Sequence, residues 1–155
     1  MAVAARLYAD HNATAPLRPA ALAAMTAALG AVGNPSSIHA EGRTARARIE
    51  AARAEVAALA GGAAAHVVFT SGASEAAATV LTPALGCETL IVFAGEHPCV
   101  AAGGRFGEPR VAPSDADGRI DLDALAGMID LPVVLALQAA NNETGVIQPV
   151  AQAAA

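Results

Sequence analysis

Lysine is missing from this sequence, and all nine of its basic residues are arginine. Tryptophan is missing too, and aromatic residues make up only 3%, so we expect a core built mainly from alanine, valine, leucine and isoleucine. Proline, glycine or a charged residue interrupts every apolar run before it reaches the ~18 residues of a membrane span. The N-terminus lacks the long apolar segment of a secretory signal. These absences predict a soluble, cytoplasmic protein with no membrane partner.

Metal-binding and disulfide patterns are missing as well. The two cysteines, Cys87 and Cys99, form neither a metal-ligand pair nor a disulfide framework. The four histidines do not have the spacing of zinc ligands. We therefore expect no metal site, and we interpret both cysteines as buried free thiols. Cys99, which directly follows His97 and Pro98, is interpreted as a packing residue.

The net charge of −5 argues against a nucleic-acid partner for this chain. One stretch, residues 41–55, is dense in arginine, but glutamates are interleaved with the arginines. Arg46 and Glu50 are four residues apart, and Glu50 and Arg53 are three apart, which are the spacings of ion pairs on a helix. An ion-paired, solvated helix face is favoured over a phosphate-binding patch.

The first 62 residues read as a helical segment. Pro19 suits the first turn of a helix that runs to Leu29. The turn residues of GNPSSIH predict a loop. A longer helix is expected from about residue 41 to residue 60, ended by glycines, and its apolar positions predict a buried inner stripe: Ala45, Ile49, Ala52, Val56 and Leu59.

From residue 63 onward, strands alternate with helices. Strands are expected at 66–69, 89–94, 110–111 and 132–138, and the run 89–94 is apolar throughout, which is typical of a strand buried on both faces. Helices are expected after Gly72 for about ten residues, briefly from Pro98, after the cap Asp121, and after Pro149. This order predicts an α/β domain with a mainly parallel sheet, preceded by N-terminal helices. We expect one incomplete domain over residues 1–155, divided into 1–62 and 63–155.

Three loops would meet at the carboxyl ends of those strands, where ligands of parallel sheets gather. They are SGASE (71–75), GEHP (95–98) and ANNETG (140–145). Each alone has an ordinary structural interpretation: Ser74 as a helix cap, His97 as a hydrogen-bonded residue at a helix start, and Asn142 as a turn residue. Together they supply a helix N-terminus for an anion, a flat ring and an amide donor. The residues themselves indicate an anionic ligand, and a small aromatic phosphate ester such as pyridoxal phosphate (PLP) would suit them.

Six stretches carry a closer resemblance. In order, they are YADHNATAPLRP, GNPSSIHAEGRTAR, VVFTSGASEA, EHPCV, DADGRIDLDAL and ANNETGVIQPV. They resemble the N-terminal portion of cysteine desulfurases, which are PLP enzymes of the class V aminotransferase family and of fold type I. The resemblance implies the first part of a PLP-transferase large domain. It also implies L-cysteine as substrate, L-alanine as product and sulfur passed to an enzyme cysteine, for iron–sulfur cluster assembly or other sulfur metabolism.

The resemblance assigns roles to four residues. The backbone amides of Ala73 and Ser74 would bind the PLP phosphate at the helix N-terminus. His97 would stack on the pyridine ring and is the catalytic candidate. Asn142 would hydrogen-bond the phenolic oxygen of the cofactor. The resemblance further implies a homodimer in the full-length form and a sulfur-acceptor protein as a partner.

Three functional residues of the family lie beyond the matched region: the Schiff-base lysine, the aspartate at the pyridine nitrogen and the persulfide cysteine. Because these 155 residues contain no lysine, a lysine Schiff base cannot form within them, and we expect the chain alone to be inactive. A further departure is Ala78, where the family usually has asparagine.

Two alternatives stay open at this stage. One is a non-catalytic remnant that binds phosphate or PLP weakly, or dimerises. The other is a selenocysteine lyase or another class V relative. In each case an open parallel sheet would expose an edge and an apolar face, so we expect the chain to aggregate or to need a complementary part.

Overall fold

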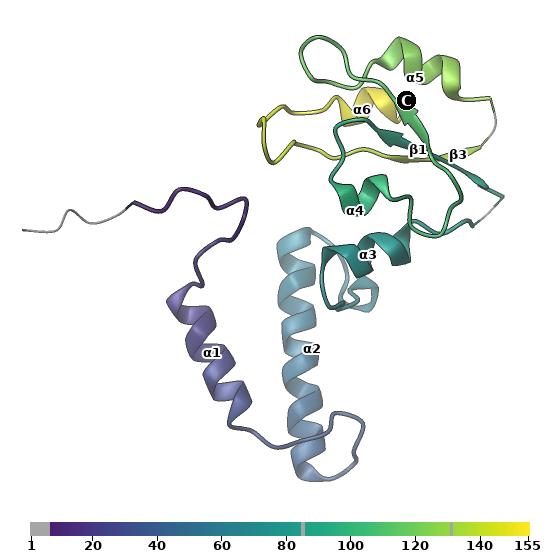
Figure 1. The fold of residues 1–155 in the computed structure, drawn as a ribbon. Helices are drawn as coiled ribbons and strands as arrows, with labels where there is room; N and C mark the ends of the chain where they lie inside the picture. The colour runs from purple at the N-terminus through teal and green to yellow at the C-terminus, as the bar shows by residue number, and fades with distance from the viewer. Residues whose placement is uncertain (1–6, 85, 131) are drawn as a thin grey trace, which may run out of the picture. The chain divides into compact units, whose positions relative to one another are not determined.

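The computed structural model describes residues 7–84, 86–130 and 132–155 (Figure 1). The chain divides into two compact units, residues 1–69 and residues 70–155, here called the first and second units. No helix within the described ranges is both long and apolar enough to cross a membrane. The predicted division into an N-terminal helical segment (1–62) and the first part of a PLP-binding domain (63–155) stays a prediction.

The first unit is helical, as expected. Helix α1 spans Pro19–Leu29 and helix α2 spans Ala40–Ala60, followed by a short 3-10 helix, η1, at Ala64–His66. Pro19 occupies the first turn of α1, where its missing N–H costs nothing. Gly61 ends α2 with φ of 68°, a left-handed conformation that favours glycine. Local sequence signals therefore fix both ends of the longest helix.

The predicted inner stripe of α2 is wrong for this chain. Leu59 is 90% exposed, Val56 is 42% exposed and Ile49 is 37% exposed. The buried positions of α2 are instead Gly42 and Ala57. An apolar stripe becomes an inner face only where another element covers it. Within the described part of the first unit, the element packed closely on α2 is the short η1.

One of the two predicted ion pairs of α2 forms. Arg53 Nε lies 3.4 Å from Glu50 Oε2. Glu50 does not pair with Arg46, so that expectation is wrong among the described residues. The Arg53 guanidinium also donates to the backbone oxygen of Val67 and lies over the ring of Phe69, with Cζ 5.2 Å from the ring centroid.

The strand predicted at 66–69 does not form. His66 closes η1, and Val67 is extended, with φ of −89° and ψ of 124°. A strand exists only through hydrogen bonds to a neighbouring strand. No described segment forms a ladder with residues 67–69, and the Val67 carbonyl already accepts from Arg53. The β-branched residues alone therefore do not make a strand here.

The second unit is an α/β structure with three parallel strands. Its elements are α3 (Ala73–Val80), β1 (Thr89–Phe93), α4 (Pro98–Ala101), β2 (Arg110–Ala112), α5 (Leu122–Met128), β3 (Val133–Ala136) and α6 (Val150–Ala153). The strand order is β2-β1-β3. Ile91 in the central strand pairs with Arg110 on one side and with Leu135 on the other. The predicted parallel α/β fold is confirmed.

Helices cover both faces of this sheet, with α5 and α6 on one side and α3 and α4 on the other (Figure 1). Side chains alternate accordingly along β1. Ile91 and Phe93 pack with Leu125 of α5, whereas Leu90 and Val92 pack with Leu81 and with Val100 of α4. The prediction that residues 89–94 form a strand buried on both faces is confirmed for Thr89–Phe93.

Candidate functional site

The loops that follow β1 and β3 are held together at the carboxyl edge of the sheet. The backbone oxygen of Gly95 accepts two side-chain hydrogen bonds, from Gln138 Nε2 at 2.7 Å and from Asn141 Nδ2 at 3.1 Å. The backbone N–H of Gln138 donates to the carboxylate of Glu96. Two of the three predicted loops therefore meet, because parallel strands end at the same edge.

The third loop leads into α3, which packs against α4. Gly72 precedes the helix and supplies no side-chain cap, so the first-turn amides of Ala73 and Ser74 have no capping acceptor there. The carboxylate of Glu75 turns back and accepts the backbone N–H of Ser71 at 2.6 Å. Hydrogen bonds from the side chain and backbone of Ser71 lower the pKa of Glu75. Helix α3 thus begins with the uncapped amides of Ala73 and Ser74, close to the carboxylate of Glu75, which is hydrogen-bonded to Ser71.

His97 caps the short helix α4. Its Nδ1 accepts the backbone N–H of Cys99 at 3.2 Å, and Pro98 fills the first helical position. The imidazole is exposed, and it directly follows the loop that Gly95 fastens to the β3 side. His97 therefore has the ordinary structural role of a helix cap, and its flat ring is also accessible to a ligand.

Both cysteines are free thiols but only half-buried, so the expectation of buried thiols is wrong. Cys99 is not simply a packing residue, because its Sγ lies 3.0 Å from Nδ1 of His97. Its position in the first turn of α4 turns the side chain back toward the cap.

Asn142 is exposed, and its neighbour Asn141 organises the loop. Asn141 Oδ1 accepts the backbone N–H groups of Glu143 at 2.9 Å and of Thr144 at 2.8 Å, while its Nδ2 reaches Gly95. Sequence reasoning missed Asn141, Gln138 and Glu96 as residues that assemble this edge. The available signal was their place directly after the strands, combined with the tendency of asparagine to bond its own backbone two or three residues on.

A mainly apolar hollow of about 530 Å³ runs along α3 and β3. Glu96 and Gln138 contribute its polar groups, and both belong to the loop pair described above. Its remaining lining comes from α3, α4 and the sheet: Ala76, Ala77, Val80, Leu81, Val100, Val134, Leu135, Ala136 and Leu137. The hollow places apolar surface directly beside the polar carboxyl edge.

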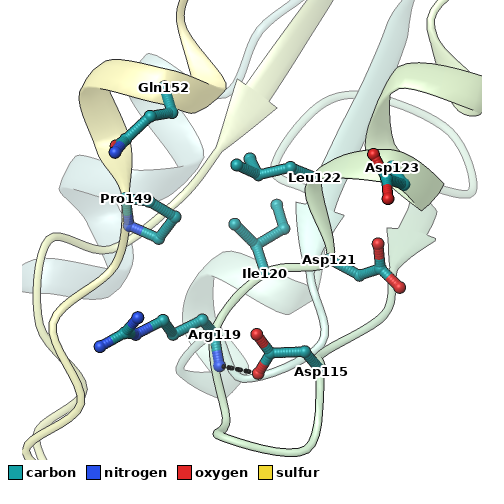
Figure 2. Close-up of a pocket in the computed structure, with 8 residues that line it drawn as sticks. All are labelled: Asp115, Arg119, Ile120, Asp121, Leu122, Asp123, Pro149 and Gln152. Carbon is teal, nitrogen blue, oxygen red and sulfur yellow. Dashed lines mark hydrogen bonds between the residues drawn. The ribbon is translucent and has the colours of Figure 1, made fainter.

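A second hollow of about 500 Å³, shown in Figure 2, is lined by Asp115, Arg119, Ile120, Asp121, Leu122, Asp123, Pro149 and Gln152. Two of its three carboxylates already hold the backbone of the fold. Asp115 Oδ1 accepts the backbone N–H of Arg119 at 2.9 Å, and Asp121 Oδ1 caps α5 through Ala124 at 2.9 Å. None of the predicted site residues lines it. Among the described residues, no three histidine, cysteine, aspartate or glutamate side chains gather as metal ligands would.

Comparisons with known proteins place this geometry in a family. The model of the aminotransferase class-V family matches residues 7–155. A cysteine desulfurase of Frankia sp. (strain EuIK1) is 37% identical, over 96% of this chain and 41% of the relative. A selenocysteine lyase of Rattus norvegicus is 31% identical, over 95% of this chain and 41% of the relative.

Solved structures agree with the sequence comparison. A NifS-like protein from Rickettsia africae superposes with a TM-score of 0.81 at 26% identity, over 93% of this chain and 42% of that one. The chain therefore spans about two-fifths of the length of the relatives that it matches. Because the family model covers almost all of the sequence, this chain belongs to the aminotransferase class-V family.

Proposed function

We propose that this chain is the phosphate- and ring-binding part of a PLP-dependent cysteine desulfurase. The observation that carries the proposal is the joined carboxyl edge, where Gly95 accepts from both Gln138 and Asn141. That junction brings the loop of His97 and the loop of Asn142 to one place. The similarity to the Frankia desulfurase supports the choice of reaction.

The donor groups of this edge suit PLP. Two uncapped amides, of Ala73 and Ser74, lie at the N-terminus of an eight-residue helix, and such a terminus favours a phosphate through its N–H groups and its dipole. His97 offers a flat ring for a pyridine, and Asn142 offers a side-chain amide for a phenolic oxygen. These 155 residues contain no lysine for covalent attachment of the cofactor.

Each residue has a separate role in this mechanism. When bound, PLP acts as an electron sink for negative charge at the substrate Cα. The amides of Ala73 and Ser74 anchor the phosphate end and so fix the position of the ring. His97 holds the ring plane, and its exposed nitrogen is placed to hold or move a proton. Asn142 would hold the phenolic oxygen of the ring through its side-chain amide.

The wider activity belongs to the same proposal. The substrate would be L-cysteine, the products L-alanine and a cysteine persulfide, and the sulfur would pass to an acceptor protein. A homodimer and a cytoplasmic location also remain proposals, as does a role in iron–sulfur cluster assembly. A complementary polypeptide part would supply the lysine and the nucleophilic cysteine.

PLP binding by this chain tests the cofactor role. We expect weak binding, seen by absorbance and competed by inorganic phosphate, and no side-chain adduct after borohydride reduction. Ala73→Pro removes one amide donor at a helical position that tolerates proline, and loss of one hydrogen bond to a charged group weakens affinity about tenfold or more. Ala40→Pro makes the same change at the first position of α2 and is the matched control. Equal affinities of these two variants would refute the phosphate site.

A selenocysteine lyase is the second candidate, because the rat relative matches over the same span. A non-catalytic remnant is the third, since the chain has no lysine. The intact mass of the native protein distinguishes the remnant from a longer enzyme. For a longer enzyme, the ratio of kcat/KM for L-cysteine and L-selenocysteine distinguishes desulfurase from lyase.

A further inference from the structure

Cys99 makes two contacts with one nitrogen of His97. Its Sγ lies 3.0 Å from His97 Nδ1, and its backbone N–H points at the same nitrogen from 3.2 Å. The thiol is half-buried, whereas the imidazole is exposed. The nitrogen Nδ1 therefore contacts two groups of a single residue, on a ring that belongs to an exposed side chain.

The backbone contact decides the direction of both hydrogen bonds. A backbone N–H can only donate, so this contact favours an Nδ1 that carries its lone pair and accepts. A neutral imidazole with an unprotonated Nδ1 holds its proton on Nε2. The thiol must then donate its S–H to Nδ1, because a thiolate would require a proton on Nδ1, where the amide N–H already points.

We propose that Cys99 is a positioning residue for His97, whose thiol and amide together hold the proton of the neutral ring on Nε2 and fix the ring plane. The link to the cofactor rests on the proposed function, in which His97 stacks on the PLP ring. In that setting Cys99 determines which nitrogen presents an N–H at the carboxyl edge of the sheet. The neighbouring carboxylate, Glu96, is engaged by the backbone of Gln138.

His39 provides a contrast within the same chain. It also caps a helix, and its Nδ1 lies 3.3 Å from the backbone nitrogen of Gly42. The same Nδ1 lies 3.0 Å from a carboxylate oxygen of Glu41. The amide of Gly42 favours an unprotonated Nδ1, whereas the carboxylate of Glu41 favours a protonated one, so the two contacts of His39 oppose each other. At His97 both neighbours can donate, so both contacts favour the form with the proton on Nε2.

Imidazole ¹⁵N spectra of the chain, labelled at its four histidines, test this assignment at pH 8. Solution or magic-angle-spinning spectra serve equally, so self-association does not prevent the measurement. We expect an unprotonated Nδ1 and a protonated Nε2 for His97. Cys99→Ala should lower the ratio of Nε2–H to Nδ1–H forms about fivefold, as expected for the loss of one neutral hydrogen bond. Cys99→Ser, which keeps a donor, should restore most of it, and Cys87→Ala should leave it unchanged.

Two results would overturn the proposal. One is a His97 ring protonated at Nδ1 in the unmodified chain. The other is an unchanged ratio of Nε2–H to Nδ1–H forms in Cys99→Ala, when the amide signals of β1 show that the sheet is intact. If those signals move, the same ratio is measured in Cys99→Ser, and a ratio as low as that of Cys99→Ala would overturn the proposal. PLP absorbance is measured on the same samples. Failure of PLP binding with the expected His97 form would refute the proposed function while leaving the role of Cys99 standing.

Discussion

Gln148 connects two segments of the second unit by holding the backbone on either side of Arg119. Its Oε1 accepts the backbone N–H of Ile120 at 2.8 Å, and its Nε2 donates to the backbone oxygen of Gly118 at 3.0 Å. The side chain is only 5% exposed. A buried amide with both ends satisfied is far less costly than one with its partners removed.

Gln148→Ala should destabilise the second unit. The change leaves the buried N–H of Ile120 and the carbonyl of Gly118 without their partner, and we expect a loss of about 1–3 kcal/mol. Hydrogen exchange at the Ile120 amide measures it directly. Gln152→Ala, on the exposed side of α6, is the control and should change exchange little. Unchanged protection at Ile120 would contradict this account of Gln148.

Gly42→Ala should disrupt the loop before α2. A Cβ at Gly42 would lie 2.4 Å from the backbone oxygen of Ser37 and 2.7 Å from that of Asn34. Neither backbone group can move without opening the loop, so overpacking of about 1–3 kcal/mol is expected. The amide of Ser37, which donates to Asn34 at 2.9 Å, reports the change by faster exchange. Gly62→Ala has open space around it and should leave that amide unaffected.

The features predicted correctly from sequence are those that depend on local chemistry. Pro19 and Gly61 mark helix ends, and Asp121 caps α5 as expected, through the backbone N–H of Ala124 at 2.9 Å. The apolar run from Thr89 became the central strand because β2 and β3 flank it. At the helix ends, a residue and its near neighbours determine the conformation. In the central strand, an unbroken apolar run requires burial on both faces.

The features predicted wrongly depend on partners distant in sequence. The run His66–Phe69 has the composition of a strand, but no described segment pairs with it. The stripe of α2 that includes Leu59 is apolar, yet the described residues of the first unit leave Leu59 exposed. At the site, sequence reasoning predicted that the loops of His97 and Asn142 lie at one edge of the sheet, and these two loops are joined there through Gly95. It could not foresee that Asn141 and Gln138 converge on a single oxygen of Gly95.

Acid should weaken the start of α3 through Glu75. Hydrogen bonds from Ser71 lower the folded-state pKa of Glu75 below its ordinary value of 4.5. The ionised carboxylate is therefore favoured in the folded state. Its contribution is fully present above the ordinary pKa and is lost as pH falls through the lowered one.

Glu75→Gln isolates this effect. The difference in helicity of α3 between the unmodified chain and the variant, followed by Cα chemical shifts, should be largest at neutral pH. It should shrink when the pH falls below the lowered pKa of Glu75. A difference that grows on acidification would show that the sign of the linkage is wrong.

Asn141→Ala should loosen the candidate site without changing any residue proposed to touch the cofactor. The variant removes the acceptor for the amides of Glu143 and Thr144, at 2.9 and 2.8 Å, together with one of the two donors to Gly95. We expect those two amides to exchange about tenfold faster, as for the loss of one hydrogen bond each. PLP affinity should fall as well, because the loop of Asn142 is then no longer fixed to the loop of His97.

Asn34→Ala is the control in the first unit. It loses a similar side-chain contact, to the backbone N–H of Ser36 at 2.9 Å, and should leave the PLP affinity unchanged. Faster exchange with undiminished PLP affinity would separate loop order from cofactor binding, and the joined edge would then be a structural feature alone.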